Sequence, residues 1–199
     1  MDIVELILDE ENQEMVGIEA VSIVSQPAIE ESFVALSSDE IKLAKVDEEK
    51  RIVMGAALVP NKMIFRKRND TMFYVYFSKD TIRRASELFF QNGNQSNATL
   101  EHQMKANNLT VVESWIVENK EKDKSALYNL DLPVGSWVIS MKIEDDELWQ
   151  QIKEGKKYTG FSIEGYFADK ASIKKSDAKS EMAAIEEEEA EYMLSNIKN

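Results

Sequence analysis

Short apolar runs recur through most of the first 167 residues, separated by polar and charged stretches. Runs rich in Val, Ile and aromatic residues, bounded by Gly, Pro or Asn, are typical of β-strands. They predict strands within residues 3–8, 20–24, 33–36, 51–60, 72–77, 109–117, 135–143 and 158–167. The pattern therefore predicts a fold in which strands dominate.

Two segments have helical spacing instead. The first follows Ser78, a favourable N-cap, and carries apolar residues three and four apart until Asn92. The second begins at Asp145 and Asp146, where acidic side chains favour the positive end of a helix, and ends near Gly155. The fold class predicted is thus α+β, mainly β, with helices between strands.

The composition changes after about residue 168. Ala, Ser, Lys and Glu dominate from there, with a weak apolar stripe and a run of four glutamates at 186–189. We interpret residues 1–168 as the folded domain and residues 169–199 as an acidic tail, partly helical or disordered. The glutamate run is more typical of a solvated helix face than of a metal site.

Charge and composition narrow the classes of function. The 199 residues include 37 acidic and 24 basic side chains, which gives a net charge of -13 and disfavours binding to nucleic acid or anionic membranes. There is no cysteine, no secretory signal pattern and no apolar run of membrane-spanning length. No Gly-rich phosphate loop or dinucleotide motif occurs, so we expect no cofactor and no metal.

One histidine and one serine stand out as a possible catalytic pair. His102 is the only imidazole in the chain, and an imidazole is the usual general base near neutral pH. Ser162 lies between Gly160 and Gly165 in a predicted strand, where alternation places it on the same face as Glu164. Either residue could equally be structural, since this is not the Gly-x-Ser-x-Gly motif.

A third residue would orient the imidazole, as a carboxylate does in a catalytic triad. Glu113 is our first choice, because a carboxylate within an apolar strand has to be paired or functional. Glu164 is the alternative, because it shares a face with Ser162. Glu101 is adjacent to His102 and would normally point the other way in a strand.

Together these segments resemble the XkdF-like serine proteases of tailed phages, which belong with the phage prohead proteases. The resemblance rests on Leu-Glu-His102, Val-Val-Glu113-Ser-Trp-Ile-Val, Leu-Pro-Val-Gly135-Ser-Trp-Val and Gly-Phe-Ser162-Ile-Glu-Gly, in that order. Two N-terminal segments that begin at Gly17 and Glu49 fit the same pattern. The resemblance covers roughly residues 1–168.

The resemblance implies an antiparallel β-barrel surrounded by helices, like the herpesvirus assemblin proteases. It implies a serine endopeptidase that cuts capsid and scaffold proteins inside the immature capsid in the host cytoplasm. Self-cleavage and a homodimer are also compatible with the resemblance. The herpesvirus members use an arginine after the nucleophile, but this chain has no arginine beyond Arg84. Its oxyanion donors must then be backbone N–H groups, a bound water or a lysine. The alternative function is an inactive head-assembly protein with the same fold.

Overall fold

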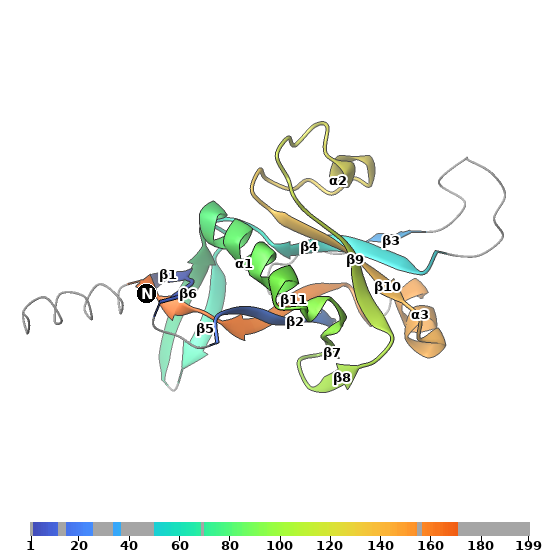
Figure 1. Cartoon of the computed structure of the whole chain (residues 1–199), viewed down its shortest axis with the longest axis horizontal. Helices are drawn as coiled ribbons and strands as arrows, with labels where there is room; N and C mark the ends of the chain where they lie inside the picture. Colours follow the sequence, from blue (N-terminus) through green and yellow to red (C-terminus); the bar gives the residue numbers. More distant parts are fainter. Residues whose placement is uncertain are drawn as a thin grey trace, which may run out of the picture.

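The computed structural model describes residues 2–11, 15–25, 50–67, 70–154 and 157–170, and the backbone alone of 34–36 and 68. The described strands form three four-stranded sheets, with helices beside them (Figure 1). The predicted β-rich α+β class is therefore confirmed. The predicted barrel is not found, because each sheet of the described strands is open and ends in two edge strands.

The sheet that carries the candidate site has the strand order β11-β2-β7-β8. It consists of β2 (Gly17–Val24), β7 (Ala98–Leu100), β8 (Met104–Ala106) and β11 (Gly160–Tyr166). β11 and β2 are antiparallel, whereas β2 and β7 are parallel. Because β2 lies in the middle, segments from the beginning, centre and end of the domain meet on one sheet.

A second sheet, of order β3-β4-β10-β9, is entirely antiparallel. It consists of β3 (Val34–Leu36), β4 (Ile52–Leu58), β9 (Leu109–Ile116) and β10 (Trp137–Ile143). Nearly every residue of β4 and β10 is buried, so these two strands form the centre of the hydrophobic core. β4 also lies beside β11, which joins the second sheet to the first.

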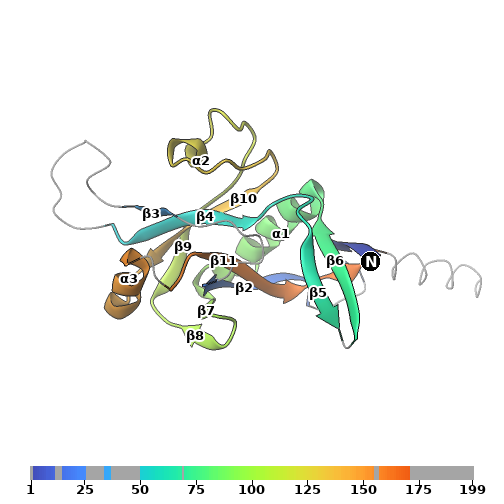
Figure 2. The same ribbon diagram turned by 180° about the vertical axis from the view of Figure 1, so that it is seen from behind.

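The third sheet lies at one end of the molecule, with the order β12-β1-β6-β5. It consists of β1 (Asp2–Ile7), β5 (Ile64–Arg68), β6 (Thr71–Phe77) and β12 (Ala168–Asp169). The view from behind shows the hairpin of β5 and β6 next to the end of β11 (Figure 2). β12 pairs with β1, so residues just beyond the predicted boundary at 168 still belong to the folded part.

The long helix α1 (Lys79–Gln91) begins as predicted, because Ser78 caps it by accepting from the Thr81 N–H. Its buried face packs on β2 and β10, where Phe89 meets Trp137 edge to face. The other described helices are short: η1 (Asn94–Ser96), α2 (Lys124–Leu127) and α3 (Asp146–Lys153). Asp145 caps α3, so both predicted helices are confirmed.

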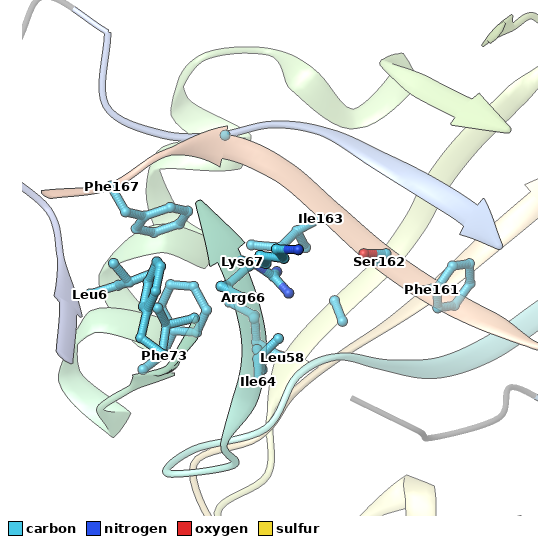
Figure 3. A pocket seen from close by; sticks show the side chains of 14 residues that line it. Leu6, Leu58, Ile64, Arg66, Lys67, Phe73, Phe161, Ser162, Ile163 and Phe167 are labelled. Carbon is cyan, nitrogen blue, oxygen red and sulfur yellow. The ribbon is translucent and has the colours of Figure 1, made fainter. Parts of the chain in front are cut away.

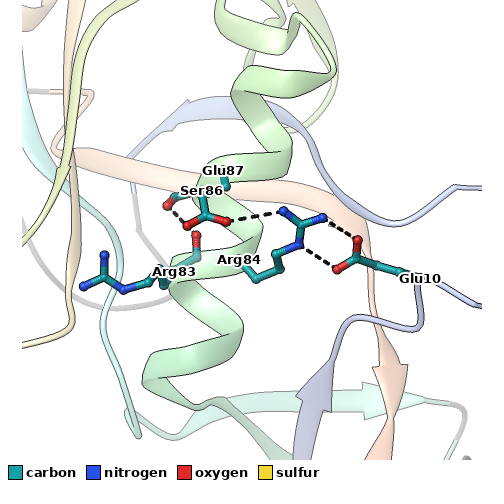
Figure 4. A network of polar contacts seen from close by, with 5 residues as sticks. All are labelled: Glu10, Arg83, Arg84, Ser86 and Glu87. Atoms are coloured by element: carbon teal, nitrogen blue, oxygen red, sulfur yellow. Dashed lines mark hydrogen bonds and ion pairs between the residues drawn. The ribbon is translucent and has the colours of Figure 1, made fainter.

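Arg84 ties the segment after β1 to the exposed side of α1 (Figure 4). Its guanidinium donates to both carboxylate oxygens of Glu10, at 2.8 and 2.6 Å, and to Glu87 at 3.3 Å. The hydrogen bonds from Arg84 lower the pKa of Glu10. This bidentate pairing fixes the segment just after β1 to α1, the helix that also packs on β2.

Candidate active site

Ser162 lies on β11 at the edge of its sheet, on the face away from the buried Phe161. Its neighbour across the sheet is Ser22 on β2, and the next strand places Thr99 beside Ser22. Paired residues on adjacent strands point to the same face, so the three hydroxyl-bearing residues form a row. Glu164 follows two positions later on that face. Ser162 is half-buried, and Ser22 is completely buried.

His102 lies in the turn between β7 and β8, next to this row. The turn closes with a hydrogen bond from the Gln103 N–H to the Leu100 carbonyl, at 3.0 Å. Its two central residues, Glu101 and His102, have φ values of 51° and 57°. Such left-handed conformations at residues other than glycine cost of order 1–3 kcal/mol each, and they persist only where surrounding contacts impose them.

Three hydrogen bonds hold this turn against β2. The backbone N–H of His102 donates to the buried Ser22 hydroxyl at 3.0 Å. The Glu101 N–H donates to the Ile23 carbonyl at 3.1 Å, and the Glu101 carboxylate accepts from the Ser25 N–H at 2.9 Å. These hydrogen bonds to β2 therefore fix the backbone that carries the imidazole, which a turn without them would not do.

The imidazole of His102 is hydrogen-bonded to Glu164, with 3.1 Å between Nδ1 and Oε1. An ionised carboxylate only accepts, so the Nδ1 atom carries the proton and Nε2 keeps its lone pair. The Thr99 hydroxyl donates to the same Oε1 atom and helps to fix the carboxylate. The side chains of His102 and Glu164 are 41% and 33% exposed, which leaves them accessible to a ligand.

Glu113 lies elsewhere, on β9 of the second sheet. Its carboxylate binds the Lys124 ammonium at 2.5 Å, and its neighbour across the sheet is Ser140. Partial burial acts to raise the pKa of Glu113, but the hydrogen bond and the charge of Lys124 lower it, and the pKa is lowered on balance. The carboxylate that contacts His102 is thus Glu164, the alternative third residue, and the structure does not bring Glu113 to the imidazole.

Two residues of this cluster, Ser22 and Thr99, were missed by sequence reasoning. Ser22 stands in the apolar run Ala-Val-Ser-Ile-Val, and a buried hydroxyl in such a run requires a hydrogen-bond partner. The hydroxyl of Ser22 in an apolar run was the available signal, but it does not identify the His102 N–H as its hydrogen-bond partner. Thr99 offered no signal, because threonine is common in strands whatever its role.

Within the described residues, no three acidic or histidine side chains gather into a possible metal site. None of the helices in this part of the chain is long and apolar enough to cross a membrane.

Comparison with known families gives a match to the model described as "Putative phage serine protease XkdF", over residues 40–171. The chain belongs to this family. The match covers more than half of the 199 residues and includes His102, Ser162 and Glu164, whereas β2 with Ser22 precedes it. The family predicted from the sequence is thus confirmed, and with it the link to phage serine proteases. No curated protein and no solved structure matches the chain.

Proposed function

We propose that this phage protein is a serine endopeptidase in which Ser162 is the nucleophile, His102 the general base and Glu164 the residue that orients the imidazole. The observation that carries the proposal is the hydrogen bond of 3.1 Å between His102 Nδ1 and Glu164 Oε1, on the sheet face that Ser162 shares. Two positions along a strand span about 7 Å, so imidazole and hydroxyl belong to one small region.

The chemistry follows from the proton positions. The Nε2 atom of His102 takes the proton of the Ser162 hydroxyl as its oxygen attacks a peptide carbonyl. Glu164 stabilises the imidazolium that results, because an ionised carboxylate beside a cation in a partly dry site lowers its energy. His102 then gives this proton to the leaving amine, and water hydrolyses the acyl-enzyme by the same route in reverse.

The substrates in this proposal are capsid and scaffold proteins, cut inside the immature phage capsid. The family supports it, because its members are described as phage serine proteases. A protease enclosed with its substrates meets them at high local concentration, so it needs no large recognition surface.

Replacement of Ser162 by alanine tests the proposal directly. Ser162→Ala should lower cleavage of the co-expressed capsid precursor by 10³-fold or more, since the proposed nucleophile is then missing. The control is Ser96→Ala, a change at an exposed serine outside the site that should leave cleavage unchanged. Precursor processing by the Ser162→Ala protein at the wild-type rate would refute the assignment.

Labelling separates an active protease from an inactive protein of the same fold. A serine-directed phosphonate should react with the wild-type protein and not with the Ser162→Ala variant, as measured by intact-protein mass spectrometry. It should react much more slowly with His102→Ala, because the base is then missing. Absence of label on the wild-type protein would favour the inactive alternative.

A further inference from the structure

A pocket of about 400 Å³ lies between β11, β4 and the hairpin of β5 and β6. Its size is near the lower end of the range for ligand pockets, so it suits a few side chains rather than a folded partner. Most of the residues that line it are apolar, and they include four phenylalanines: Phe73, Phe77, Phe161 and Phe167. Figure 3 shows Phe73 and Phe167 close together near Leu6.

The pocket adjoins the proposed nucleophile. Phe161, Ser162 and Ile163 all line it, although strand alternation directs the serine to the opposite face from its two neighbours. This is possible because β11 is the edge strand of its sheet, so that a ligand lying along the edge can touch both faces. A peptide whose carbonyl reaches Ser162 would therefore place an adjacent side chain at the mouth of this pocket.

Two cations from β5 also line the pocket. In the view of Figure 3, the nitrogen ends of Arg66 and Lys67 lie between Phe73 and Ser162. No carboxylate of the described residues pairs with either of them, and the Arg66 guanidinium donates to the neighbouring Phe65 carbonyl at 3.0 Å.

The surroundings of Arg66 make a carboxylate ligand favourable. The residue as a whole is exposed, but its guanidinium is packed closely enough that burial lowers the pKa of Arg66. A cation that has lost part of its water and has no counter-charge gains more from an incoming carboxylate than a fully hydrated cation does. The planar guanidinium can also hold a carboxylate through two parallel hydrogen bonds.

We propose that this pocket is the substrate-recognition subsite, and that it takes peptide segments in which an acidic side chain adjoins a large apolar one. The apolar side chain fills the phenylalanine-lined space, and Arg66 and Lys67 hold the carboxylate. The inference rests on the proposed protease function, because it takes Ser162 as the atom that the peptide approaches. It adds a substrate class to that function.

Binding to a non-cleaving protein tests recognition apart from catalysis. The full-length Ser162→Ala protein is titrated with three fluorescein-labelled hexapeptides: Ala-Ala-Leu-Glu-Ala-Ala, its Gln-for-Glu form and its Ser-for-Leu form. Fluorescence polarisation should show the first peptide binding about tenfold or more tightly than either other one, because each control lacks one of the two interactions. Equal affinity for the Glu and Gln peptides would overturn the proposal.

Charge removal at the pocket should abolish this preference. With Arg66→Gln and Lys67→Gln combined in the Ser162→Ala protein, the Glu and Gln peptides should bind within about twofold of each other. The matched control is Lys122→Gln, which removes an exposed charge from the loop before α2 and should keep the preference. Retention of the full preference in the double variant would also contradict the inference.

Cleavage assays then separate this inference from the proposed function. If the wild-type protein cleaves the Glu and Gln peptides with the same kcat/KM, the protease assignment stands and the recognition proposal fails. If the Ser162→Ala protein prefers the Glu peptide but the wild-type protein cleaves none, recognition stands and the protease proposal fails. If Arg66→Gln lowers kcat equally for both peptides, Arg66 acts in the chemistry and not in recognition, which contradicts the inference.

Discussion

Glu113 and Glu164 are two carboxylates in similar sequence surroundings with different partners. Each stands in a β-strand directly after a branched apolar residue, and each side chain is about one third to one half exposed. Glu113 is paired with a lysine, whose charge is permanent near neutral pH, whereas Glu164 is paired with an imidazole, whose charge can change. The partner, and not the carboxylate itself, decides which of the two can take part in proton transfer.

The largest effect expected from this comparison is on catalysis. Glu164→Gln keeps the shape of the side chain but removes its charge, so the imidazole loses the group that fixes its tautomer and stabilises its cation. We expect kcat to fall about 10³- to 10⁴-fold in a peptide-cleavage assay, as expected for loss of the orienting carboxylate in a triad.

Glu113→Gln is the matched control, because it makes the same change on the other strand. It should leave kcat within about twofold of the wild-type value, since its carboxylate contacts Lys124. The opposite ranking of the two variants would restore Glu113 as the orienting residue and remove Glu164 from the mechanism.

A smaller effect is expected from the support beneath His102. Ser22→Ala leaves the His102 N–H without its acceptor inside the sheet, which should lower the free energy of unfolding by about 1–3 kcal/mol. The turn should also relax from its left-handed conformation, so kcat should fall by about tenfold. Urea unfolding and peptide cleavage measure the two quantities.

Ser136→Ala is a suitable comparison for this change. Ser136 is equally buried, and its hydroxyl donates to the Pro133 carbonyl at 2.8 Å, away from the imidazole. This variant should lose stability and keep its kcat. If both variants lowered kcat to the same extent, the effect of Ser22 would be general destabilisation and not positioning of His102.

The smallest effect concerns the stability that Glu113 contributes. Glu113→Gln should lower the free energy of unfolding by about 0.2–1 kcal/mol at neutral pH, the range for partly exposed ion pairs. The pKa of Glu113 is lowered in the folded state, so this contribution is complete above the ordinary value of 4.5 and disappears as the pH falls through the lower folded value.

Thermal unfolding at two pH values tests whether the stability contributed by Glu113 decreases as the pH falls. The difference between the wild-type protein and Glu113→Gln should be present at pH 7 and shrink below pH 4.5. Lys124→Gln should show the same loss, since it removes the other partner of the pair. A difference that grows in acid would mean that the carboxylate is not held ionised by Lys124.

The sequence predicted the individual elements well where local signals agree. α1 has a capping serine, an apolar face and a stop at Asn92, and each of these acts within a few residues. β4 is apolar along its whole length, which marks it as a buried strand without knowledge of its neighbours. β10 is interrupted only by Ser140 and Lys142.

Strand pairing could not be predicted in the same way. The parallel pairs β1–β6 and β2–β7 join segments about 70 residues apart, and no local pattern specifies them. The resemblance implied a barrel, but the order of hydrogen-bonded strands gives three open sheets. Pairing depends on the long-range burial of whole faces, which a one-dimensional pattern does not encode.

The site shows the same division between local and long-range information. The sequence indicates His102 and Ser162 as candidates, because an imidazole can act as a base and a hydroxyl as a nucleophile whatever the fold. Glu164 and Glu113 have similar local patterns, so only the arrangement of the sheets separates them. The role of Ser22 could not be inferred, because its partner is a backbone N–H 80 positions away in the chain.

The left-handed backbone at His102 lowers the stability of the protein, but the proposed activity needs a histidine at this position. Glycine and asparagine adopt this conformation readily, whereas histidine is held in it by the contacts of the turn. Exchange of His102 for either residue should therefore raise the melting temperature of the protein while it removes the proposed general base. A single substitution should thus give a form of this phage protein that is more stable to heat but lacks the proposed activity.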